Sequence, residues 1–424
     1  MDIEYIYKIY LQFPSVQTDS RKIKKNDFFF ALKGPNFNGN EFARQALNAG
    51  AAYVVADEPV GFEDEKILYT ENVLQTLQHL AKYHREQFSI PFIAITGSNG
   101  KTTTKELLHE VLSTTFRTYT TQGNLNNHIG IPLTILKIKT DAEIAVIEMG
   151  ANHLHEIAGY CEYAQPTHGL ITNIGKAHLE GFGSEENVKK GKGELFDYVK
   201  KDGGIVFVNT DDVAVYDLGK SMKNAVFYGS KNESVKGEIL KNDPFIEVKI
   251  EDGKSLTIQT HLVGAYNLPN ILAAVCVGKF FKIDVEKVRH AIKNYQPTNS
   301  RSQLIQKGSN SIILDAYNAN PGSMKAAIEN FARMKGDKKI LLLGSMMELG
   351  KESEKEHATI ISLIDQHKWE SVVLVGKNFG EIRNKYIHFE DAEQAGKWLK
   401  DQHFENVQML VKGSRSMQME KALE

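Results

Sequence analysis

Hydrophobic residues recur along the chain with the two periods that distinguish strands from helices, and their arrangement divides the sequence into three regions. The first region opens with an apolar strand-like run at 27–32, continues with a helical pattern at 42–47 that stops at Gly50, and returns to a strand-like run at 52–55. An amphipathic helix then leads out of the region. These patterns predict a small mixed α/β domain over residues 1–88.

The second region repeats one motif, in which a short apolar strand ends in a polar residue or a glycine and is followed by helical periodicity. This alternation is typical of a mostly parallel sheet. Apolar residues that alternate on both sides of Asp252-Gly253 predict an antiparallel hairpin appended to the sheet. Because Pro297 marks the next boundary, we expect this domain over residues 89–297. The predicted strands are 92–96, 145–148, 169–173 and 205–209.

The third region, residues 298–424, has the same alternation and predicts a doubly wound, Rossmann-like domain. Its strands end in residues suited to ligand contacts, and open α/β sheets bind ligands at the carboxyl ends of their strands. The whole chain is therefore expected to be a three-domain α/β protein. The predicted strands are 312–314, 340–343, 372–375 and 409–411, and the residues that follow them are Asp315, Gly344, Gly376 and Lys412.

Bulk composition narrows the class of protein. A chain of 424 residues exceeds what one hydrophobic core usually serves, which agrees with several domains. The formal net charge of -2 provides no global field that would attract nucleic acid, so we expect no nucleic-acid partner. Any anionic ligand must therefore be held by a local site.

Cysteine usage and hydropathy indicate a cytoplasmic protein without membrane insertion. The two cysteines, Cys161 and Cys276, lack the spacing of a disulfide framework or a zinc site. The N-terminus has no basic region followed by an apolar core, and the longest apolar helical run, 271–277, is too short to cross a bilayer.

The strongest chemical motif is a glycine-rich turn between a predicted strand and a predicted helix. Glycines let successive backbone N–H groups converge on phosphate oxygens, a helix start favours negative charge, a lysine adds a full positive charge and a threonine can bind magnesium. A turn that only connects two elements does not need this combination. We therefore predict a site for ATP with Mg²⁺ at Gly97, Ser98, Asn99, Gly100, Lys101, Thr102 and Thr103.

Single residues elsewhere are less decisive. Glu148 ends an apolar strand, where its carboxylate can bind magnesium or simply face solvent. An isolated histidine such as His178 is more often a packed or surface residue than a ligand, and Lys192 taken alone reads as surface charge. Arg301 can reach phosphates from the third domain, but taken alone it is better explained as a linker arginine exposed to water.

The segment 315–321 is more informative, because a strand end leads into an asparagine-rich turn that proline closes. Asp315 there can accept from ribose hydroxyls, so function is favoured over a simple connection.

Together these motifs resemble the Mur ligases of cell-wall synthesis over nearly the whole chain. The resemblance implies a uridine-nucleotide domain at Thr18-Asp19-Ser20-Arg21 and a substrate-facing loop at 124–132. It also implies metal binding by Thr102, Glu148, His178 and a carbamylated Lys192. Implied nucleotide contacts are Asn267 and Asn270, which fall where the family contacts adenine, and Arg301, Asp315, Tyr317 and Asn318. Implied substrate contacts are Ser20, Arg21, Asn124, Asn126, Asn127, Asn320, Lys412, Ser414 and Arg415.

Two third-domain motifs, Tyr317-Asn318-Ala319-Asn320-Pro321 and Met347-Glu348-Leu349-Gly350, resemble the branch of the family whose acceptor is D-alanyl-D-alanine. The alternatives are a branch that adds diaminopimelate or lysine, a folylpolyglutamate-synthase-like ligase, and a nucleotide-binding partner subunit without catalysis. The chain departs from the family pattern at Ser345, Ser300 and Asn38-Gly39-Asn40, where an acidic residue, glycine and Asp-Gly-His are usual.

The resemblance implies an ADP-forming amide ligase that joins D-alanyl-D-alanine to UDP-N-acetylmuramoyl-tripeptide. A carboxylate is a poor acyl donor, so transfer of the ATP γ-phosphoryl group gives an acyl phosphate that an amine can attack. Phosphoryl transfer depends on positioning and charge neutralisation. We therefore expect catalytic roles for Lys101, Lys192, His178 and Arg301, two magnesium sites and a monomeric enzyme.

Overall fold

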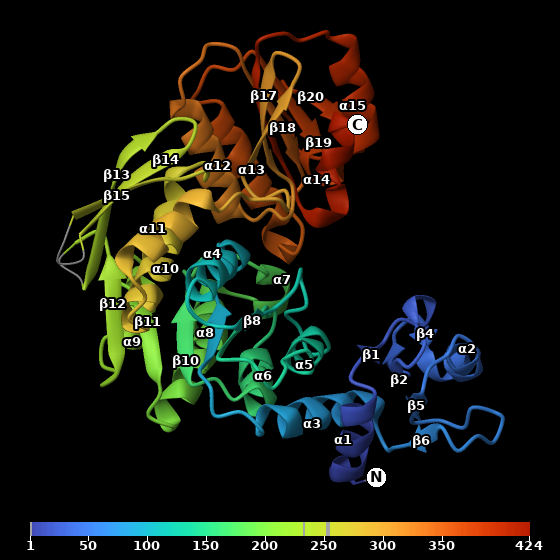
Figure 1. Cartoon of the computed structure of the whole chain (residues 1–424). Coiled ribbons are helices and arrows are strands. Elements are labelled where there is room, and N and C mark those ends of the chain that lie inside the picture. Colours follow the sequence, from blue (N-terminus) through green and yellow to red (C-terminus); the bar gives the residue numbers. More distant parts are fainter. Residues whose placement is uncertain (1, 232–233, 252–254) are drawn as a thin grey trace. The chain divides into compact units, whose positions relative to one another are not determined.

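The structure is a computed structural model that describes residues 2–231, 234–251 and 255–424. The chain gathers into two compact units, one formed by Met1–Ile95, Phe116–Ala151 and His155–Gly169 and the other by Thr96–Thr115, Asn152–Leu154 and Leu170–Glu424. Three main sheets, one in each predicted region, confirm the three-domain α/β architecture (Figure 1). The domain boundaries themselves stay predictions.

The N-terminal sheet is parallel, with strand order β1-β2-β5-β6. Its core consists of small and apolar side chains such as Phe29 and Val54, which pack against α2 residues such as Ala43 and Ala46. The elements are α1 (Ile3–Gln12), β1 (Val16–Gln17), η1 (Ser20–Lys22), β2 (Phe28–Phe30), β3 (Lys33–Gly34), β4 (Phe37–Asn38), η2 (Gly39–Phe42), α2 (Ala43–Asn48), β5 (Tyr53–Ala56), β6 (Ile67–Tyr69) and α3 (Val73–Arg85).

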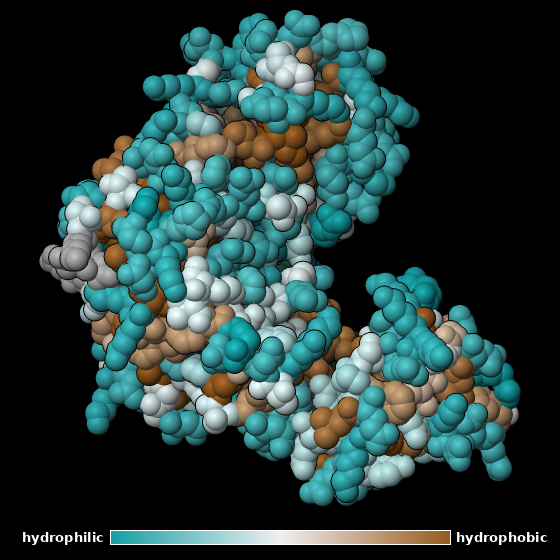
Figure 2. All heavy atoms as spheres, in the orientation of Figure 1, coloured by the Kyte–Doolittle hydropathy of each residue, from teal (hydrophilic) through white to brown (hydrophobic). Residues whose placement is uncertain are grey.

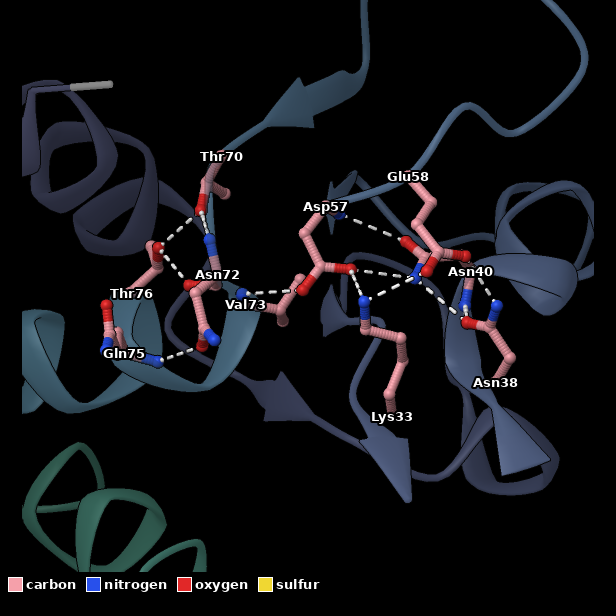
Figure 3. A network of polar contacts seen from close by, with 10 residues as sticks. All are labelled: Lys33, Asn38, Asn40, Asp57, Glu58, Thr70, Asn72, Val73, Gln75 and Thr76. Carbon is pink, nitrogen blue, oxygen red and sulfur yellow. Dashed lines mark hydrogen bonds and ion pairs between the residues drawn. The ribbon is translucent and has the colours of Figure 1, made fainter. Parts of the chain in front are cut away.

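A polar network at the carboxyl edge of this sheet accounts for the unusual Asn38-Gly39-Asn40 sequence (Figure 3). Asn40, which is 4% exposed, donates to Asp57 Oδ1 at 2.9 Å and accepts from the Asp57 N–H at 3.1 Å. Asn38 caps η2 and donates to Glu58 at 2.6 Å. Asp57 Oδ2 also accepts from the N–H of Val73, the first residue of α3. The two asparagines therefore help to fix where the long helix begins.

The central sheet has nine strands hydrogen-bonded in the order β15-β14-β13-β12-β11-β10-β7-β9-β8, and parallel pairs dominate it. The antiparallel pair β14-β15 confirms the predicted hairpin, whose turn residues 252–254 lie outside the described residues, and β13 extends it to a three-stranded meander. The strands are β7 (Phe92–Thr96), β8 (Thr118–Thr120), β9 (Ile144–Glu148), β10 (His168–Ile171), β11 (Ile205–Asn209), β12 (Ala225–Gly229), β13 (Val235–Asn242), β14 (Ile246–Glu251) and β15 (Ser255–Gln259).

Helices accompany these strands in the order expected for a repeated strand–helix pattern. Within the second unit α4 packs against α10 and α11, and within the first unit α3 packs against α5 and α6. The helices are α4 (Lys101–Ser113), α5 (Gly130–Ile135), α6 (Glu156–Ala164), α7 (Leu179–Phe182), α8 (Glu185–Lys201), α9 (Val213–Gly219), η3 (Ala265–Asn267), α10 (Leu268–Phe280) and α11 (Val285–Asn294).

The C-terminal sheet has the order β16-β17-β21-β18-β19-β20 and is parallel except for β16, which pairs antiparallel with β17. One face packs against α15 and the C-terminal turns. The elements are β16 (Gln303–Lys307), β17 (Asn310–Asp315), α12 (Pro321–Arg333), β18 (Lys339–Gly344), η4 (Gly350–Glu352), α13 (Ser353–Ile364), β19 (Ser371–Val375), α14 (Lys377–Gly380), β20 (Ile387–Phe389), α15 (Ala392–Asp401), β21 (Gln408–Lys412), η5 (Arg415–Met417) and η6 (Met419–Leu423).

None of the helices in the described residues is both long and apolar enough to cross a bilayer. The long apolar helix α10 is buried inside the protein from Asn270 to Gly278. Most of the face drawn in Figure 2 is coloured as hydrophilic.

Candidate active site

The predicted phosphate loop lies between β7 and α4, and its backbone has the shape that glycine allows. Gly97 has φ +142° and Gly100 has φ +77°. A Cβ atom on Gly97 would overlap Thr172 Oγ1, and one on Gly100 would lie 2.5 Å from Asn270 Oδ1. Because L side chains rarely adopt these φ values, both positions require glycine. The loop is therefore a backbone cradle at a helix start, which suits phosphate.

Two residues after β10 hold this cradle in shape. The N–H groups of Ser98 and Asn99 donate to the main-chain and side-chain oxygens of Asn173, both at 2.9 Å. The Asn99 carbonyl accepts from Thr172 Oγ1 at 2.6 Å and from Asn173 Nδ2 at 2.9 Å. Sequence reasoning missed the role of Thr172 and Asn173. The one available signal was that a predicted strand ends at the polar residue Asn173.

The lysine and the threonine of the loop both lie in the first turn of α4. Lys101 Nζ donates to the Gly97 carbonyl at 2.8 Å, so the lysine folds back over the loop. Thr102 is 4% exposed at the first turn of α4. Gly100 is the N-cap and contributes no side chain. The loop thus presents backbone N–H groups, one cation and one hydroxyl at a single helix start.

The two asparagines expected at the adenine are buried and used within the protein. Asn267 Oδ1 accepts from Asn270 Nδ2 at 2.8 Å, and Asn267 Nδ2 donates to the Val263 carbonyl at 2.9 Å. Asn270 Oδ1 accepts from Thr104 Oγ1 at 3.1 Å. In this structure both residues support α4 and the loop, so direct contact with adenine stays a prediction.

In the first unit, Glu148 lies at the carboxyl end of β9, where it pairs in register with Ile95 of β7. Its Oε1 accepts from Asn126 Nδ2 at 2.8 Å, and its N–H donates to Thr121 Oγ1 at 2.9 Å. Glu148 is 1% exposed, so it is not the solvent-facing strand-end charge of the simpler interpretation. The carboxylate is instead bound to the predicted substrate loop.

The rest of that loop is shaped by its own asparagines. Asn127 Oδ1 accepts from the N–H groups of Ile129 and Gly130, which starts α5, whereas Asn124 is exposed. Next to the loop lies a cavity of about 540 Å³ between α3 and α6. His128 lines it, and none of the predicted site residues does. Its other lining residues include Gln78, Lys82, His155, Tyr160 and Tyr163.

His178 and Lys192 lie at two neighbouring helices of the second unit, the short α7 and the long α8. His178 precedes α7, and its Nδ1 lies 2.7 Å from Glu348 Oε2. The contact is short, although the ring N–H is not aligned on the carboxylate as in a regular hydrogen bond. Contact with His178 lowers the pKa of Glu348, and the charge of Lys101 acts in the same direction. Lys192 of α8 is fully buried, with Nζ 5.2 Å from the ring centre of Phe182, so it is not a surface lysine.

Third-domain residues form a compact cluster around the start of α12. The Arg301 guanidinium stacks on the Tyr317 ring at 3.6 Å, and among the described residues its buried Nε has no hydrogen-bond partner. An orphaned arginine nitrogen of this kind suits an anionic ligand. Ser300, where the family pattern has glycine, has φ +56°, which explains that preference.

Asp315 and Lys412 form a buried ion pair at 2.6 Å, and Lys412 Nζ also donates to the Asn318 carbonyl at 3.2 Å. Asp315 Oδ1 accepts from the Ser302 N–H at 3.0 Å. Both charged groups expected to face ligands are therefore engaged with each other. Asn320 caps α12 and donates to Asn99 Oδ1 at 2.8 Å, which brings the third domain to the phosphate loop.

The remaining predicted contacts lie apart from this cluster or turn inward. Ser414 is 2% exposed and bonded to the N–H of Met347, and Arg415 pairs with Glu420 at 2.5 Å. Arg21, next to Ser20 in η1, is exposed and forms a bidentate pair with Asp19. Ser345, where an acidic residue was expected, is fully buried, and its hydroxyl donates to the Val375 carbonyl at 3.2 Å.

The donor chemistry fits magnesium bound with a nucleotide. In the described ranges no three His, Cys, Asp or Glu side chains gather as a preformed metal site. Magnesium that accompanies a nucleotide takes much of its coordination from phosphate oxygens and water, so one hydroxyl and one carboxylate suffice from the protein. Thr102 of the second unit and Glu148 of the first are residues of these two donor types, and their joint role as metal ligands stays a prediction.

Comparison with known proteins places this geometry in a family. Residues 12–87 match the family described as "Mur ligase family, catalytic domain", residues 95–278 match "Mur ligase middle domain", and residues 300–415 match "Mur ligase, glutamate ligase domain". A UDP-N-acetylmuramoyl-tripeptide–D-alanyl-D-alanine ligase from Bacillus subtilis (strain 168) is 34% identical over 418 residues, which span 96% of this chain and 91% of that protein. The chain belongs to the Mur ligase family.

Two solved Mur ligases resemble the whole chain. MurF from Acinetobacter baumannii has a TM-score of 0.88 at 30% identity, covering 96% of this chain and 92% of that one. MurF from Thermotoga maritima, solved in complex with ADP, has a TM-score of 0.88 at 28% identity, covering 97% of each chain. A diaminopimelate ligase and a folylpolyglutamate synthase from Mycobacterium tuberculosis, at 18% and 14% identity, share the fold alone.

Proposed function

We propose that the chain is an ATP-dependent ligase that joins D-alanyl-D-alanine to UDP-N-acetylmuramoyl-tripeptide. The observation that carries the ATP half of this function is the glycine cradle, where Gly97 and Gly100 have positive φ and a Cβ atom at either position would overlap a neighbouring side chain. The acceptor half rests on the names of relatives at about one-third identity over nearly the full chain. The reaction consumes ATP, which fits a cytoplasmic enzyme, and we propose that it acts as a monomer.

In the proposed reaction the substrate carboxylate attacks the γ-phosphorus of ATP, the bond to the β–γ bridging oxygen breaks, and ADP leaves. The amine of D-alanyl-D-alanine then attacks the acyl phosphate, an amide forms, and phosphate and a proton are released. Lys101 and the first N–H groups of α4 hold the phosphates, while Arg301 adds charge from the third domain. Bound magnesium supplies further charge neutralisation at the transferred group.

We propose Thr102, Glu148, His178 and Lys192 as the protein's metal ligands. Glu148 belongs to the first compact unit and the other three to the second, so the set rests on the sequence pattern. Lys192 is proposed to react as a neutral amine with carbon dioxide, giving a carbamate and one proton. Its complete burial supports this proposal, because desolvation favours the neutral amine, which is the form that reacts with carbon dioxide.

We further propose the domain boundaries 1–88, 89–297 and 298–424. The three family matches, at residues 12–87, 95–278 and 300–415, fall inside these limits and support them. Contacts of Asn267, Asn270, Asp315, Tyr317 and Asn318 with the nucleotide are proposed for the bound state. The proposed substrate contacts are Ser20, Arg21, Asn124, Asn126, Asn127, Asn320, Lys412, Ser414 and Arg415.

The test is phosphate release with UDP-N-acetylmuramoyl-tripeptide and a panel of amines. We expect release with D-alanyl-D-alanine and none with diaminopimelate, lysine or glutamate. A Lys101→Ala variant should fold but not turn over, whereas Lys325→Ala, which changes an exposed lysine of α12, should behave as wild type. Preference for a single amino acid would overturn the proposed acceptor, and activity in Lys101→Ala would overturn the role of the loop.

A further inference from the structure

His178 and Glu348 come from different predicted domains and meet in the second compact unit. His178 precedes α7 in the central region, and Glu348 lies between β18 and η4 in the C-terminal region. His178 Nδ1 is fully buried at 2.7 Å from Glu348 Oε2. The Glu348 carbonyl also accepts from the N–H of Glu180 at 3.0 Å. Two separate contacts therefore join the two segments at this point.

Hydrogen bonds to successive backbone N–H groups fix the segment that precedes Glu348. The Met346 N–H donates to His357 Nε2 at 3.0 Å, and the Met347 N–H donates to Ser414 Oγ at 2.9 Å. Glu348 itself has φ +62°, an uncommon conformation for a residue with a side chain. Backbone that is fixed in this way places a side chain more reproducibly than a free loop does.

The chemistry of the pair specifies which imidazole nitrogen is available. An ionised carboxylate can only accept, so a contact with Glu348 requires His178 Nδ1 to carry the hydrogen. In the neutral imidazole the lone pair is then on Nε2. Histidines that bind metals usually donate their other N–H to a carboxylate, a carbonyl or water, which fixes the ring and its tautomer.

We propose that Glu348 is a positioning residue that holds His178 as the Nδ1–H tautomer and orients Nε2 toward the metal bound with the nucleotide. This inference rests on the proposed role of His178 as a metal ligand. It gives the Met347-Glu348-Leu349-Gly350 motif a function within the site. A residue of the C-terminal domain thereby orients a metal ligand of the central domain.

A second ion pair offers a matched control. Lys176, two residues before His178, contacts Glu356 of α13 at 2.7 Å, and this Glu356 side chain is 5% exposed. The pair joins the same two regions but does not touch the imidazole. If Glu348 only helped to hold the domains together, loss of Glu356 would have a comparable effect.

The first experiment measures the His178 tautomer by ¹H–¹⁵N correlation in the full-length, metal-free protein, with His178→Ala used for assignment. We expect the Nδ1–H form in wild type, in Glu348→Gln and in Glu356→Gln. Glu348→Gln retains an acceptor oxygen, whereas Glu348→Ala should give a mixture of tautomers. An Nε2–H form in wild type, or an unchanged spectrum in Glu348→Ala, would overturn the proposal.

The second experiment measures Mn²⁺ affinity by electron paramagnetic resonance in the presence of a non-hydrolysable ATP analogue. Glu348→Ala should weaken binding by about tenfold to a hundredfold, the range typical of lost partners of metal ligands, while Glu348→Gln recovers most of it and Glu356→Gln is unchanged. Equal losses in Glu348→Ala and Glu356→Gln would overturn positioning in favour of domain association. Unchanged affinity in His178→Ala would instead refute the proposed ligand role of His178, independently of the tautomer result.

Discussion

The side-chain amide of Asn320 donates to Asn99 Oδ1 at 2.8 Å, and the same asparagine accepts from the N–H of Ser323 to cap α12. One residue of the C-terminal domain thus begins a helix and contacts the phosphate loop. Any movement of the loop on nucleotide binding is therefore coupled to the start of α12.

Replacing Asn320 by alanine should weaken both functions. We expect the free energy of unfolding to fall by about 1 kcal/mol because the cap is lost. The Kd for an ATP analogue should rise several-fold because Asn99 loses its partner. Chemical denaturation and fluorescence titration measure the two effects. Ser323→Ala, which removes the reciprocal half of the capping box but keeps the Asn99 contact, should affect stability alone. Unaltered nucleotide affinity in Asn320→Ala would show that the contact is incidental.

Adding one methyl group to the cradle should abolish nucleotide binding. In Gly97→Ala the new Cβ meets Thr172 Oγ1, and in Gly100→Ala it meets Asn270 Oδ1, in both cases at a φ that disfavours alanine. Isothermal titration with ADP should detect no binding by either variant.

The matched substitution is Gly159→Ala, because a Cβ atom there meets nothing within 4 Å and the residue lies inside α6. Alanine in a helix interior should raise the free energy of unfolding by about 0.5–1 kcal/mol and leave ADP binding unchanged. Normal binding by Gly97→Ala would mean that the loop relaxes around the added atom.

The carbamate at Lys192 is tested by substitution and chemical rescue. Lys192→Ala should lose most ligase activity and regain part of it when short-chain carboxylates are added, because they replace the missing anionic oxygens. Lys192→Arg should not be rescued, since its guanidinium still fills the position. Phosphate release and the intact mass of the protein in bicarbonate buffer are the measurements. Full activity of Lys192→Ala would rule the carbamate out.

Acid should destabilise the protein through His168. Burial lowers the pKa of His168 from 6.5 to about 4, so the native state keeps it neutral where the unfolded chain binds a proton. As the pH falls from 6.5 to 4, this group should reduce the free energy of unfolding by at most ~1.4 kcal/mol per pH unit. Above pH 6.5 its contribution is constant.

Urea denaturation of wild type and His168→Gln between pH 7.5 and 4.5 isolates this contribution. Burial also lowers the pKa of His84 and His357, so both proteins should lose stability in acid. The free energy of unfolding of the variant should fall less steeply with decreasing pH, because one fewer proton is taken up on unfolding. Parallel curves would mean that His168 is protonated in the native state as readily as in the unfolded one.

The strands that sequence patterns predicted are the long apolar ones. The bounds of β7 and β11 agree with prediction, and β17, β18, β19 and β21 differ by one or two residues at their ends. The short edge strand β8 and the strands β12, β16 and β20 were missed. Of these strands β8, β16 and β20 lie at sheet edges and β12 lies inside its sheet, but all four are partly exposed and only three to five residues long, so tertiary pairing decides them more than local pattern does.

At the candidate site, the local sequence pattern located the phosphate loop but not the residues that hydrogen-bond to it. Thr172 and Asn173 lie more than 70 positions from Asn99, and nothing near the loop points to them. Similarly, the charges of Asp315 and Lys412 each looked available for a ligand, because their mutual contact spans 97 positions. The positive φ of Ser300 is a local feature rather than a long-range one, but a serine residue does not by itself indicate it.

The hydrogen bonds from Ser98 and Asn99 to Asn173 limit how far this motif can be transplanted. An engineer who copied residues 96–104 into another parallel sheet would move the glycines and the lysine but leave behind the strand end that orients two of the loop's amides. The graft would need an asparagine at the equivalent place on the neighbouring strand. The nucleotide site therefore depends on two adjacent strands together. A sequence search confined to the loop detects only one of them.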